Sequence, residues 1–387
     1  MTIDIHGHVT SPELFKRFPM PPSLADIDGM IEQKAKLGID TTIVGSPVGA
    51  GTMVPVPGLD NYAQSADAID SFHEWVAETV RAHGNHLRGY VYLNPFADDD
   101  SLSRAAKRLA QEEFVGLIVN TSVRGEYLGS PDADQFFALA AETGSPVLLH
   151  PPAEPVGASA MHGHLGLIEH IARPCDVTSG VASILFAGWL DKYPTLKLIV
   201  ANAGGALSLL REKLDLAQQR AMAGGPPNGR PGGPGGPAGP AGPGNAGGPG
   251  GPPNGRPGGP PPFSQPAGPP SGPPSGRPTG PPAGAVGGPP SGARPGGPAA
   301  EALTPISRQL SRLYVDTATP SQLALAAAAE VFGPEHLLFG TDSPPLTSPL
   351  QATLDMVARL DVTEAQRDAI RAGTARELFG LTEGPTP

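Results

Sequence analysis

The sequence predicts an α/β fold, a (β/α)8 TIM barrel, from three observations. Short apolar or β-branched runs recur eight times, and each is followed by loop signals and a helical pattern. The runs are apolar throughout, as expected of parallel strands that are covered on both faces. Outside one Gly/Pro-rich stretch about 310 residues remain, a size that suits a single barrel with loop elaborations. An open doubly wound sheet is the alternative architecture.

The expected strands alternate with expected helices along the chain. The strands are 2–9, 41–46, 87–94, 115–120, 146–150, 196–202, 313–317 and 337–341. Two of the intervening stretches place apolar side chains at helical spacing. These side chains are Ile69, Phe72, Val76 and Val80 before the third strand, and Leu207, Leu210, Leu214 and Ala217 after the sixth. We therefore expect residues 1–222 and 301–387 to form one barrel domain.

A Gly/Pro-rich insertion, 223–300, separates the sixth and seventh strands. One decapeptide occurs at 225–234 and again at 251–260, which is typical of slippage in a low-complexity tract. Because the segment has few large apolar side chains, it cannot offset the entropy lost on ordering. We expect a disordered insertion, and a Pro-rich ligand tract for a partner domain is the alternative.

Composition limits the classes of binding partner and the cellular compartments that we expect for the protein. The formal net charge is −11, which disfavours binding to nucleic acid or to anionic membranes. Cys175 is the single cysteine, so neither an intrachain disulfide nor a thiolate metal site is expected. The N-terminus leads directly into a strand, and no apolar run reaches the ~18 residues that a membrane span requires. We expect a cytoplasmic protein with a small-molecule substrate; a homodimer is one option, because the sequence does not set the oligomeric state.

A metal centre is predicted where several strands end. His6 and His8 lie two residues apart on the first strand, so their side chains point to the same side. Such a pair is also common in proteins without an ion, but His150 ends the fifth strand and Asp342 follows the eighth. The carboxyl ends of barrel strands open onto one face, so these four residues should converge. The set suits one divalent ion: Zn²⁺ is expected, and Mn²⁺ and Fe²⁺ are alternatives.

With these residues the chain resembles a known family, the amidohydrolase-related metal enzymes of the aminocarboxymuconate-semialdehyde decarboxylase branch. The resemblance covers everything except the insertion, and it implies that residues 1–222 and 301–387 form a catalytic barrel of the metal-dependent hydrolase type. It rests on the segments 6–8, 149–152, 194–205, 314–317 and 339–344. These motifs are specific for the family but not for its substrate. The fourth strand has no lysine that could bridge two metal ions, which favours a single ion.

One departure from the family pattern bears on the chemistry. The family's sixth strand usually ends in His-x-Gly-Gly, whereas this chain has Asn202 at the histidine position. An asparagine amide can hold a water or a substrate oxygen, but it cannot exchange a proton near neutral pH. Asp342 is the expected replacement as acid/base. The histidines at 162, 164 and 170 are alternatives if the segment that carries them folds over the pocket.

The residues that contact the substrate are expected on neighbouring strand ends. Asn94 and Asn120 end the third and fourth strands, and Arg124 follows closely. The planar guanidinium of Arg124 suits a carboxylate, although these residues are equally typical of turns and of a solvated surface. Asp316, near the end of the seventh strand, is expected either to hydrogen-bond a ligand histidine or to cap the next helix.

The resemblance and the residues together favour a metal-dependent carboxy-lyase. The expected reaction removes CO₂ from a small aromatic or unsaturated carboxylic acid, with Asp342 handling the proton that replaces CO₂. Decarboxylation needs no separately activated water, so it tolerates Asn202 better than hydrolysis does. A hydrolase of an ester, lactone or amide, with Asp342 as general base, is the first alternative. A non-catalytic barrel or an iron-dependent oxygenase on the same ligand set is the second.

Overall fold

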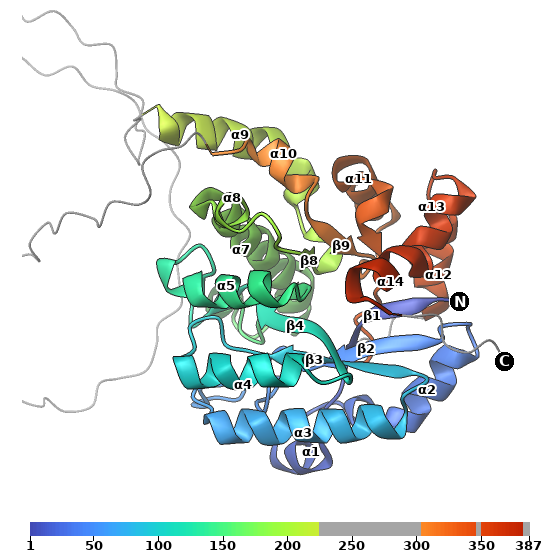
Figure 1. Cartoon of the computed structure of the whole chain (residues 1–387). Coiled ribbons are helices and arrows are strands. Elements are labelled where there is room, and N and C mark those ends of the chain that lie inside the picture. The colour runs from blue at the N-terminus through green and yellow to red at the C-terminus, as the bar shows by residue number, and fades with distance from the viewer. Residues whose placement is uncertain (224–302, 346–349, 382–387) are drawn as a thin grey trace, which may run out of the picture. The chain divides into compact units, whose positions relative to one another are not determined.

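The computed structural model describes residues 1–223, 303–345 and 350–381. Within these ranges eight parallel strands form one sheet, and helices surround it (Figure 1). The strands are β1 (Ile3–His8), β2 (Thr41–Gly45), β3 (Leu87–Tyr92), β4 (Phe114–Asn120), β7 (Val147–His150), β8 (Leu198–Val200), β9 (Tyr314–Asp316) and β10 (Leu337–Leu338). Each predicted strand is present, and the (β/α)8 barrel is confirmed.

The sheet curls until its two ends approach each other. Neighbouring strands follow the order β1-β2-β3-β4-β7-β8-β9-β10, and each strand is parallel to the next. The amide of Ile5 in β1 donates to the carbonyl of Phe339, directly after β10, at 2.9 Å. A cluster of buried side chains fills the interior: Ile3, Ile43, Ile118, Leu148, Ile199 and Leu338 belong to it. Phe379, from the last helix, packs beneath them near the start of β4.

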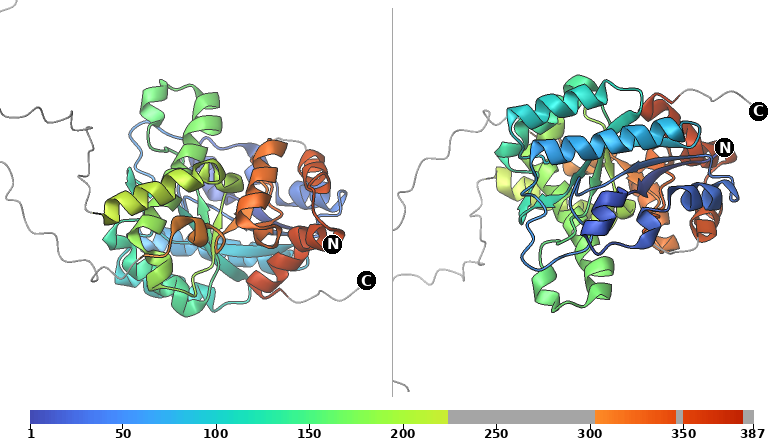
Figure 2. Two further views of the ribbon diagram at one scale, coloured as in Figure 1. Left: turned by 90° about the horizontal axis from the view of Figure 1, so that it is seen from above. Right: turned by 90° about the horizontal axis from the view of Figure 1, so that it is seen from below.

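The helices between the strands cover the outside of the barrel (Figures 1 and 2). The principal ones are α2 (Ile27–Ala35), α3 (Ala66–Ala82), α4 (Asp99–Leu109), α5 (Asp134–Thr143), α7 (Arg173–Ala187), α9 (Leu207–Met222) and α11 (Gln322–Phe332). After β10 come α12 (Leu350–Ala358), α13 (Glu364–Asp368) and α14 (Thr374–Phe379). The shorter helices are α1 (Pro12–Arg17), α6 (Leu165–Leu167), α8 (Trp189–Lys192) and α10 (Ile306–Leu310), and a small hairpin joins β5 (Ser122–Val123) to β6 (Glu126–Tyr127).

Two helices show how far apolar spacing predicts burial. In α3, Ser65 caps the amide of Ala68, and Phe72, Val76 and Val80 are buried as their spacing predicts. In α9 the prediction is only partly right, because Leu207 is buried but Ala217 is exposed. Gln218 is buried there instead and donates a hydrogen bond to the carbonyl of Thr304 (3.1 Å), on the returning chain.

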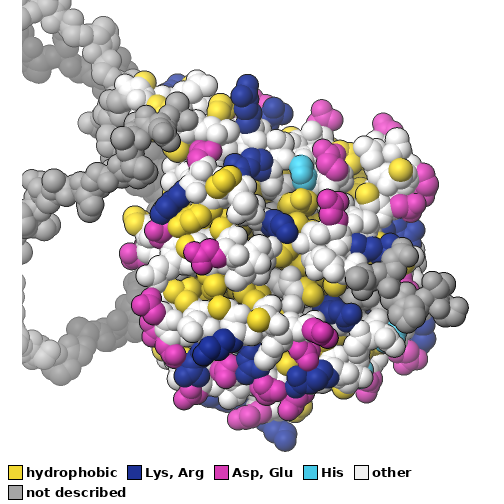
Figure 3. All heavy atoms as spheres, viewed as in Figure 1, with side chains coloured by type: hydrophobic (Ala, Val, Ile, Leu, Met, Phe, Trp, Pro, Cys, Tyr) yellow, Lys and Arg dark blue, Asp and Glu magenta, His cyan; other side chains and the backbone are white. Residues whose placement is uncertain are grey.

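Some expectations fall outside what the structure describes. The predicted insertion, apart from residue 223, lies outside the described residues. The described residues that carry the strands belong to one compact unit. No helix within the described ranges is long and apolar enough to cross a membrane. Acidic and basic side chains are interspersed over α3 and α4 (Figure 3). The cytoplasmic location, the homodimer and the absence of nucleic-acid partners stay predictions.

Candidate metal centre

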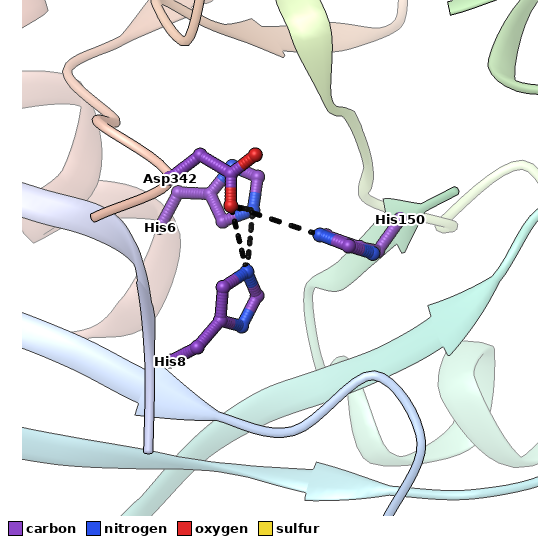
Figure 4. Close-up of side chains that lie close together, drawn as sticks. All are labelled: His6, His8, His150 and Asp342. Atoms are coloured by element: carbon purple, nitrogen blue, oxygen red, sulfur yellow. Dashed lines mark hydrogen bonds and ion pairs between the residues drawn. The ribbon is translucent and has the colours of Figure 1, made fainter. Parts of the chain in front are cut away.

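The structure brings the four predicted ligands together at the end of the barrel where the strands terminate (Figure 4). Nε2 of His8 lies 2.9 Å from Oδ1 of Asp342 and 3.2 Å from Nε2 of His6. Nε2 of His150 lies 3.9 Å from the same Asp342 oxygen. One ligand atom from each residue lies within 4.8 Å of the others, and all four residues are buried. We call these four residues the metal centre.

A β-bulge in β1 turns both histidines of the His-x-His motif into the barrel. The register against β2 contains one extra residue of β1 between Asp4 and Gly7. Ile5 belongs to the apolar interior of the barrel. Without the extra residue, strict alternation from Ile5 would send His6 and His8 to the outer face. The bulge therefore allows Ile5 to pack in the apolar interior of the barrel while His6 and His8, further along the same strand, also point inward.

Hydrogen bonds at Nδ1 orient the three imidazoles. In each ring Nδ1–H faces an oxygen acceptor, which leaves Nε2 directed at the centre of the cluster. The acceptors are Asp316 Oδ2 for His6 (2.6 Å), the Gly45 carbonyl for His8 (3.3 Å) and the Pro151 carbonyl for His150 (2.7 Å). The buried Nε2 of His150 has no hydrogen-bond partner among the described residues. Three oriented nitrogens and one carboxylate fit a single divalent ion.

Asp316 has the first of the two roles expected for it, the hydrogen bond to a ligand histidine, whereas Ser321 and not Asp316 caps the next helix, α11. Oδ2 of Asp316 holds His6, while its Oδ1 accepts the amides of Ala203 (3.0 Å) and Ala318 (3.1 Å). This fully buried carboxylate therefore ties the end of β9 to β1 and to the turn after β8.

Burial and neighbouring charges set the protonation of the cluster. Burial lowers the pKa of His8 and lowers that of His150 to about 3. Burial also acts to lower the pKa of His6, but the carboxylates of Asp342 and Asp316 outweigh it and raise that pKa to about 9. At Asp342 burial acts to raise the pKa, but the imidazoles around it hold that pKa well below its usual range. Without a bound ion, these shifts favour neutral His8 and His150 at pH 7 and a protonated His6 beside an ionised Asp342.

The turn after β8 carries the departure from the family pattern. Residues 202–205 all have positive φ, which Asn and Gly tolerate and which costs Ala203 about 1–2 kcal/mol. The bond from the Ala203 amide to Asp316 offsets part of that cost. Nδ2 of Asn202 donates to the Ala318 carbonyl at 3.5 Å, and the buried Oδ1 of Asn202 has no partner among the described residues. An amide oxygen that can accept a hydrogen bond thus stands in the place of the family histidine.

Asp342 differs from the other ligands in its backbone and in its second oxygen. Its φ of 54° is left-handed, an uncommon conformation for a residue other than glycine. The short contacts to the imidazoles are made by Oδ1, whereas Oδ2 points away from His8 (Figure 4). One carboxylate therefore presents an oxygen to the ion and another to the space beside it.

The alternative acid/base histidines, at 162, 164 and 170, are all exposed. They lie on the segment that extends from the barrel after β7 (Figure 2).

Asn120 is the one predicted substrate residue that sits beside a ligand. It pairs with His150 across β4 and β7, and its Nδ2 donates to the Pro151 carbonyl (3.5 Å) that also holds the His150 ring. Its buried Oδ1 has no partner among the described residues.

The other two predicted substrate residues are engaged elsewhere. Oδ1 of Asn94 accepts the amide of Phe96 (3.1 Å), and Asn94 lines a cavity of about 180 Å³ between α3 and α4 rather than the metal centre. Arg124 lines a cleft of about 720 Å³ formed by the loops after β2, β4 and β7. There it is paired with Asp60, with Nη2 2.7 Å from Oδ2. We call these loops the cleft rim.

Three residues that the sequence analysis did not select complete the surroundings of the centre. Asp4 and Thr341 are buried next to ligands in the chain, and Lys34 is buried on α2. Lys34 follows the buried Met30 by one helical turn, and a lysine on an apolar helix face indicates a buried partner. That signal was present in the sequence, but it does not name Asp4 as the partner.

Comparison with known proteins places the chain in a family. The sequence pattern of the amidohydrolase family matches residues 3–228 and 286–381. The chain belongs to the amidohydrolase family. It is 24% identical over 155 residues to a 2-amino-3-carboxymuconate-6-semialdehyde decarboxylase from Dictyostelium discoideum. That match spans 39% of this chain and 43% of the relative, so less than half of the relative is covered.

Solved structures share the fold along the whole chain. A 5-carboxyvanillate decarboxylase from Sphingomonas paucimobilis superposes with a TM-score of 0.65 at 15% identity, covering 98% of this chain and 99% of that one. A dihydroxybenzoic acid decarboxylase from Polaromonas, solved with manganese and the inhibitor 2-nitroresorcinol, gives 0.63 at 19% identity, covering 99% and 98%. These superpositions show the shared barrel fold, and the family match confirms the expected resemblance.

Proposed function

We propose that this amidohydrolase is a metal-dependent carboxy-lyase that releases CO₂ from a small aromatic or unsaturated carboxylic acid. His6, His8, His150 and Asp342 would hold one divalent ion. Zn²⁺ is the expected ion, and Mn²⁺ and Fe²⁺ fit the same donors. Relatives with this barrel act on carboxylated aromatic rings and on a carboxymuconate semialdehyde, and one of them binds manganese.

The observation that carries the proposal is the amide at Asn202. Hydrolysis requires a group that takes a proton from the attacking water and passes it on, and a carboxamide does neither near neutral pH. Decarboxylation requires a proton at a single carbon. The buried Oδ1 of Asn202 has no partner in the part of the chain that the structure describes, which suits an acceptor for a substrate hydroxyl or an ordered water.

The chain's own residues then divide the reaction between them. When bound, the ion supplies positive charge that holds the substrate carboxylate or an adjacent hydroxyl and stabilises developing negative charge. The bond between the carboxyl carbon and its neighbouring carbon breaks, and its electron pair stays on that neighbour. A proton drawn from solvent would reach this carbon through Oδ2 of Asp342, which points away from His8. CO₂ leaves, so one proton is consumed for each CO₂ released.

Two further residues would orient the substrate. Oδ1 of Asn120, buried beside His150, would accept a hydrogen bond from a substrate hydroxyl. Arg124 lines the cleft, and its guanidinium would bind a second carboxylate by exchanging it for that of Asp60. Asn94 faces a different cavity, so we assign it no substrate contact in this proposal.

Product analysis tests the proposal against its alternatives. The full chain is loaded with Zn²⁺ or Mn²⁺ and incubated with hydroxybenzoates labelled with ¹³C at the carboxyl group, in D₂O. We expect ¹³CO₂ and one deuterium at the carbon that carried the carboxyl group, with neither product from Asp342→Asn. Incorporation of ¹⁸O from labelled water into an ester, lactone or amide product would indicate a hydrolase. Consumption of O₂ would indicate an oxygenase, and an inert metal-loaded protein would indicate a binding barrel.

A further inference from the structure

A buried ion pair lies on the outer side of the barrel, behind the metal centre. Nζ of Lys34, on α2, lies 2.7 Å from Oδ2 of Asp4, on β1. The side chain of Asp4 is 0% exposed and that of Lys34 2% exposed. Removing two charges from water is costly, and a buried pair is weak evidence of a gain in stability. The contacts of this pair indicate a different role.

Every further hydrogen bond of Asp4 leads to a segment that carries a ligand. Oδ1 accepts the backbone amide of His6 (3.0 Å) and that of Thr341 (3.1 Å). Oδ2 accepts the hydroxyl of Thr341 (2.6 Å) in addition to the Lys34 ammonium. His6 is a ligand itself, and Thr341 precedes the ligand Asp342. One carboxylate therefore joins the two ends of the chain that supply three of the four ligands.

These bonds lie where β1 meets the chain that follows β10. The backbones approach there through the Ile5 amide and the Phe339 carbonyl, at 2.9 Å. The bulge of β1 interrupts its pairing with β2 at the same residues, and the side chain of Asp4 adds bonds from β1 to Thr341. Gly7 leaves room for this arrangement, because a Cβ there would lie 2.6 Å from Cγ2 of Thr42 and 3.4 Å from Nζ of Lys34.

We infer that Asp4, Lys34 and Thr341 act together as a clamp where β1 meets the chain after β10. The clamp fixes the His6–His8 pair relative to Asp342, and it thereby sets the affinity and geometry of the bound ion. Lys34 holds the carboxyl group of Asp4 in place through the 2.7 Å contact, so that the other three hydrogen bonds of Asp4 can form. The clamp touches neither ion nor substrate, and its three members act by positioning the ligands. Groups that orient metal ligands typically change metal affinity by about 10–100-fold. The inference rests on the metal centre of the proposed function.

Thr341 offers the mildest test. Thr341→Val removes the hydroxyl without changing the shape of the side chain, and Thr341→Ser retains it. Lys34→Met removes the buried charge, and Arg108→Met is its matched control. Arg108 is likewise buried and paired, with Asp70 at 2.9 Å, but it lies on α4 away from the metal centre. Each full-length variant is titrated with Mn²⁺ and with Co²⁺, and its melting temperature is recorded with and without the ion.

We expect Thr341→Val and Lys34→Met to weaken Mn²⁺ binding by about tenfold or more and to alter the visible spectrum of bound Co²⁺. Thr341→Ser should resemble the wild type, and Arg108→Met should lower the melting temperature while leaving the Mn²⁺ dissociation constant within about twofold. Wild-type affinity and Co²⁺ spectrum in Thr341→Val would overturn the clamp, even if Lys34→Met fails to fold. A wild-type protein that binds neither ion would instead overturn the proposed function.

Discussion

The metal centre and the cleft rim lie at the same end of the barrel, but different forces fix them. The metal centre consists of residues at strand ends that are buried and held by hydrogen bonds to Asp316, Gly45 and Pro151. The rim consists of loops, and Arg124 there has an exposed side chain paired with an equally accessible Asp60. Strand topology therefore determines the positions of the residues in the metal centre, whereas local loop contacts determine the positions of those on the cleft rim. Substitutions in the two regions should differ accordingly in size and kind.

The largest expected effect is at Asp342. Asp342→Asn removes the group that passes the proton, so kcat should fall by about 10²–10⁴-fold, the usual contribution of a general acid or base. The three histidines should retain much of the ion, which metal analysis of the purified variant checks. Asp60→Asn on the rim is the matched control, and its kcat should stay within about twofold of the wild type. Equal losses in both variants would remove the distinction between centre and rim.

Metal affinity should rise with pH because of His6. Its pKa of about 9 means that the ion must displace a proton at neutral pH, so affinity should rise up to tenfold per pH unit between 6.5 and about 9. The stability of the protein in EDTA should show the opposite trend. A raised pKa stabilises the fold below the ordinary value of 6.5, and this contribution is lost as pH rises through about 9.

Calorimetric titration in buffers of different ionisation enthalpy measures the protons released, and urea unfolding in EDTA measures the stability. Binding that releases no proton at pH 7 would show that His6 is already neutral there. His73 serves as an internal contrast, because burial lowers its pKa to about 4 and it lies away from the metal centre. Replacing it with glutamine should leave proton release unchanged.

Asn202 should have an intermediate effect. If it only accepts a hydrogen bond, Asn202→Ala should reduce kcat by about threefold to tenfold, in line with the loss of about 0.5–1.5 kcal/mol for one hydrogen bond. Asn202→His restores the family residue. Activity that appears only in Asn202→His, on substrates to which the wild type is inert, would show that the wild-type pocket has lost its reaction.

The smallest effect is expected on the rim. Arg124→Met should leave the melting temperature almost unchanged, because exposed ion pairs contribute about 0–1 kcal/mol. If Arg124 binds a substrate carboxylate, KM should rise several-fold while kcat stays constant. Arg104→Met, which removes an exposed ion pair on α4, is the control and should change neither constant. A fall in kcat comparable to that of Asp342→Asn would place Arg124 in the catalytic step.

The same comparison explains what the sequence could and could not predict. Apolar runs fix the strands, and in a parallel barrel the strand ends must meet, so the convergence of His6, His8, His150 and Asp342 could be predicted. The bulge in β1 could not be predicted, because no residue near it indicates that β1 contains one extra residue where it pairs with β2. Strict alternation correctly predicted that His6 and His8 share one side of the strand. It could not predict that this side faces the barrel interior, because the bulge determines that.

Contacts beyond the strand ends are harder to predict because they depend on packing between distant segments. Asn94 ends a strand as predicted, yet its side chain accepts the amide of Phe96 and leaves the centre. The pairing of Asp4 with Lys34 joins β1 to α2, and a lysine on a helix face does not name its partner. In α9, Gln218 is buried because the chain returns at Thr304, which lies beyond the insertion.

X-ray absorption at the zinc edge tests the central claim most directly. The full chain is loaded with one equivalent of Zn²⁺ and compared with His8→Ala and with the rim variant Asp60→Asn. We predict nitrogen and oxygen ligands at about 2.0–2.2 Å with the multiple scattering of imidazole rings, reduced in His8→Ala and unchanged in Asp60→Asn. A Zn²⁺ shell without imidazole scattering, or one that His8→Ala leaves intact, would contradict the metal centre.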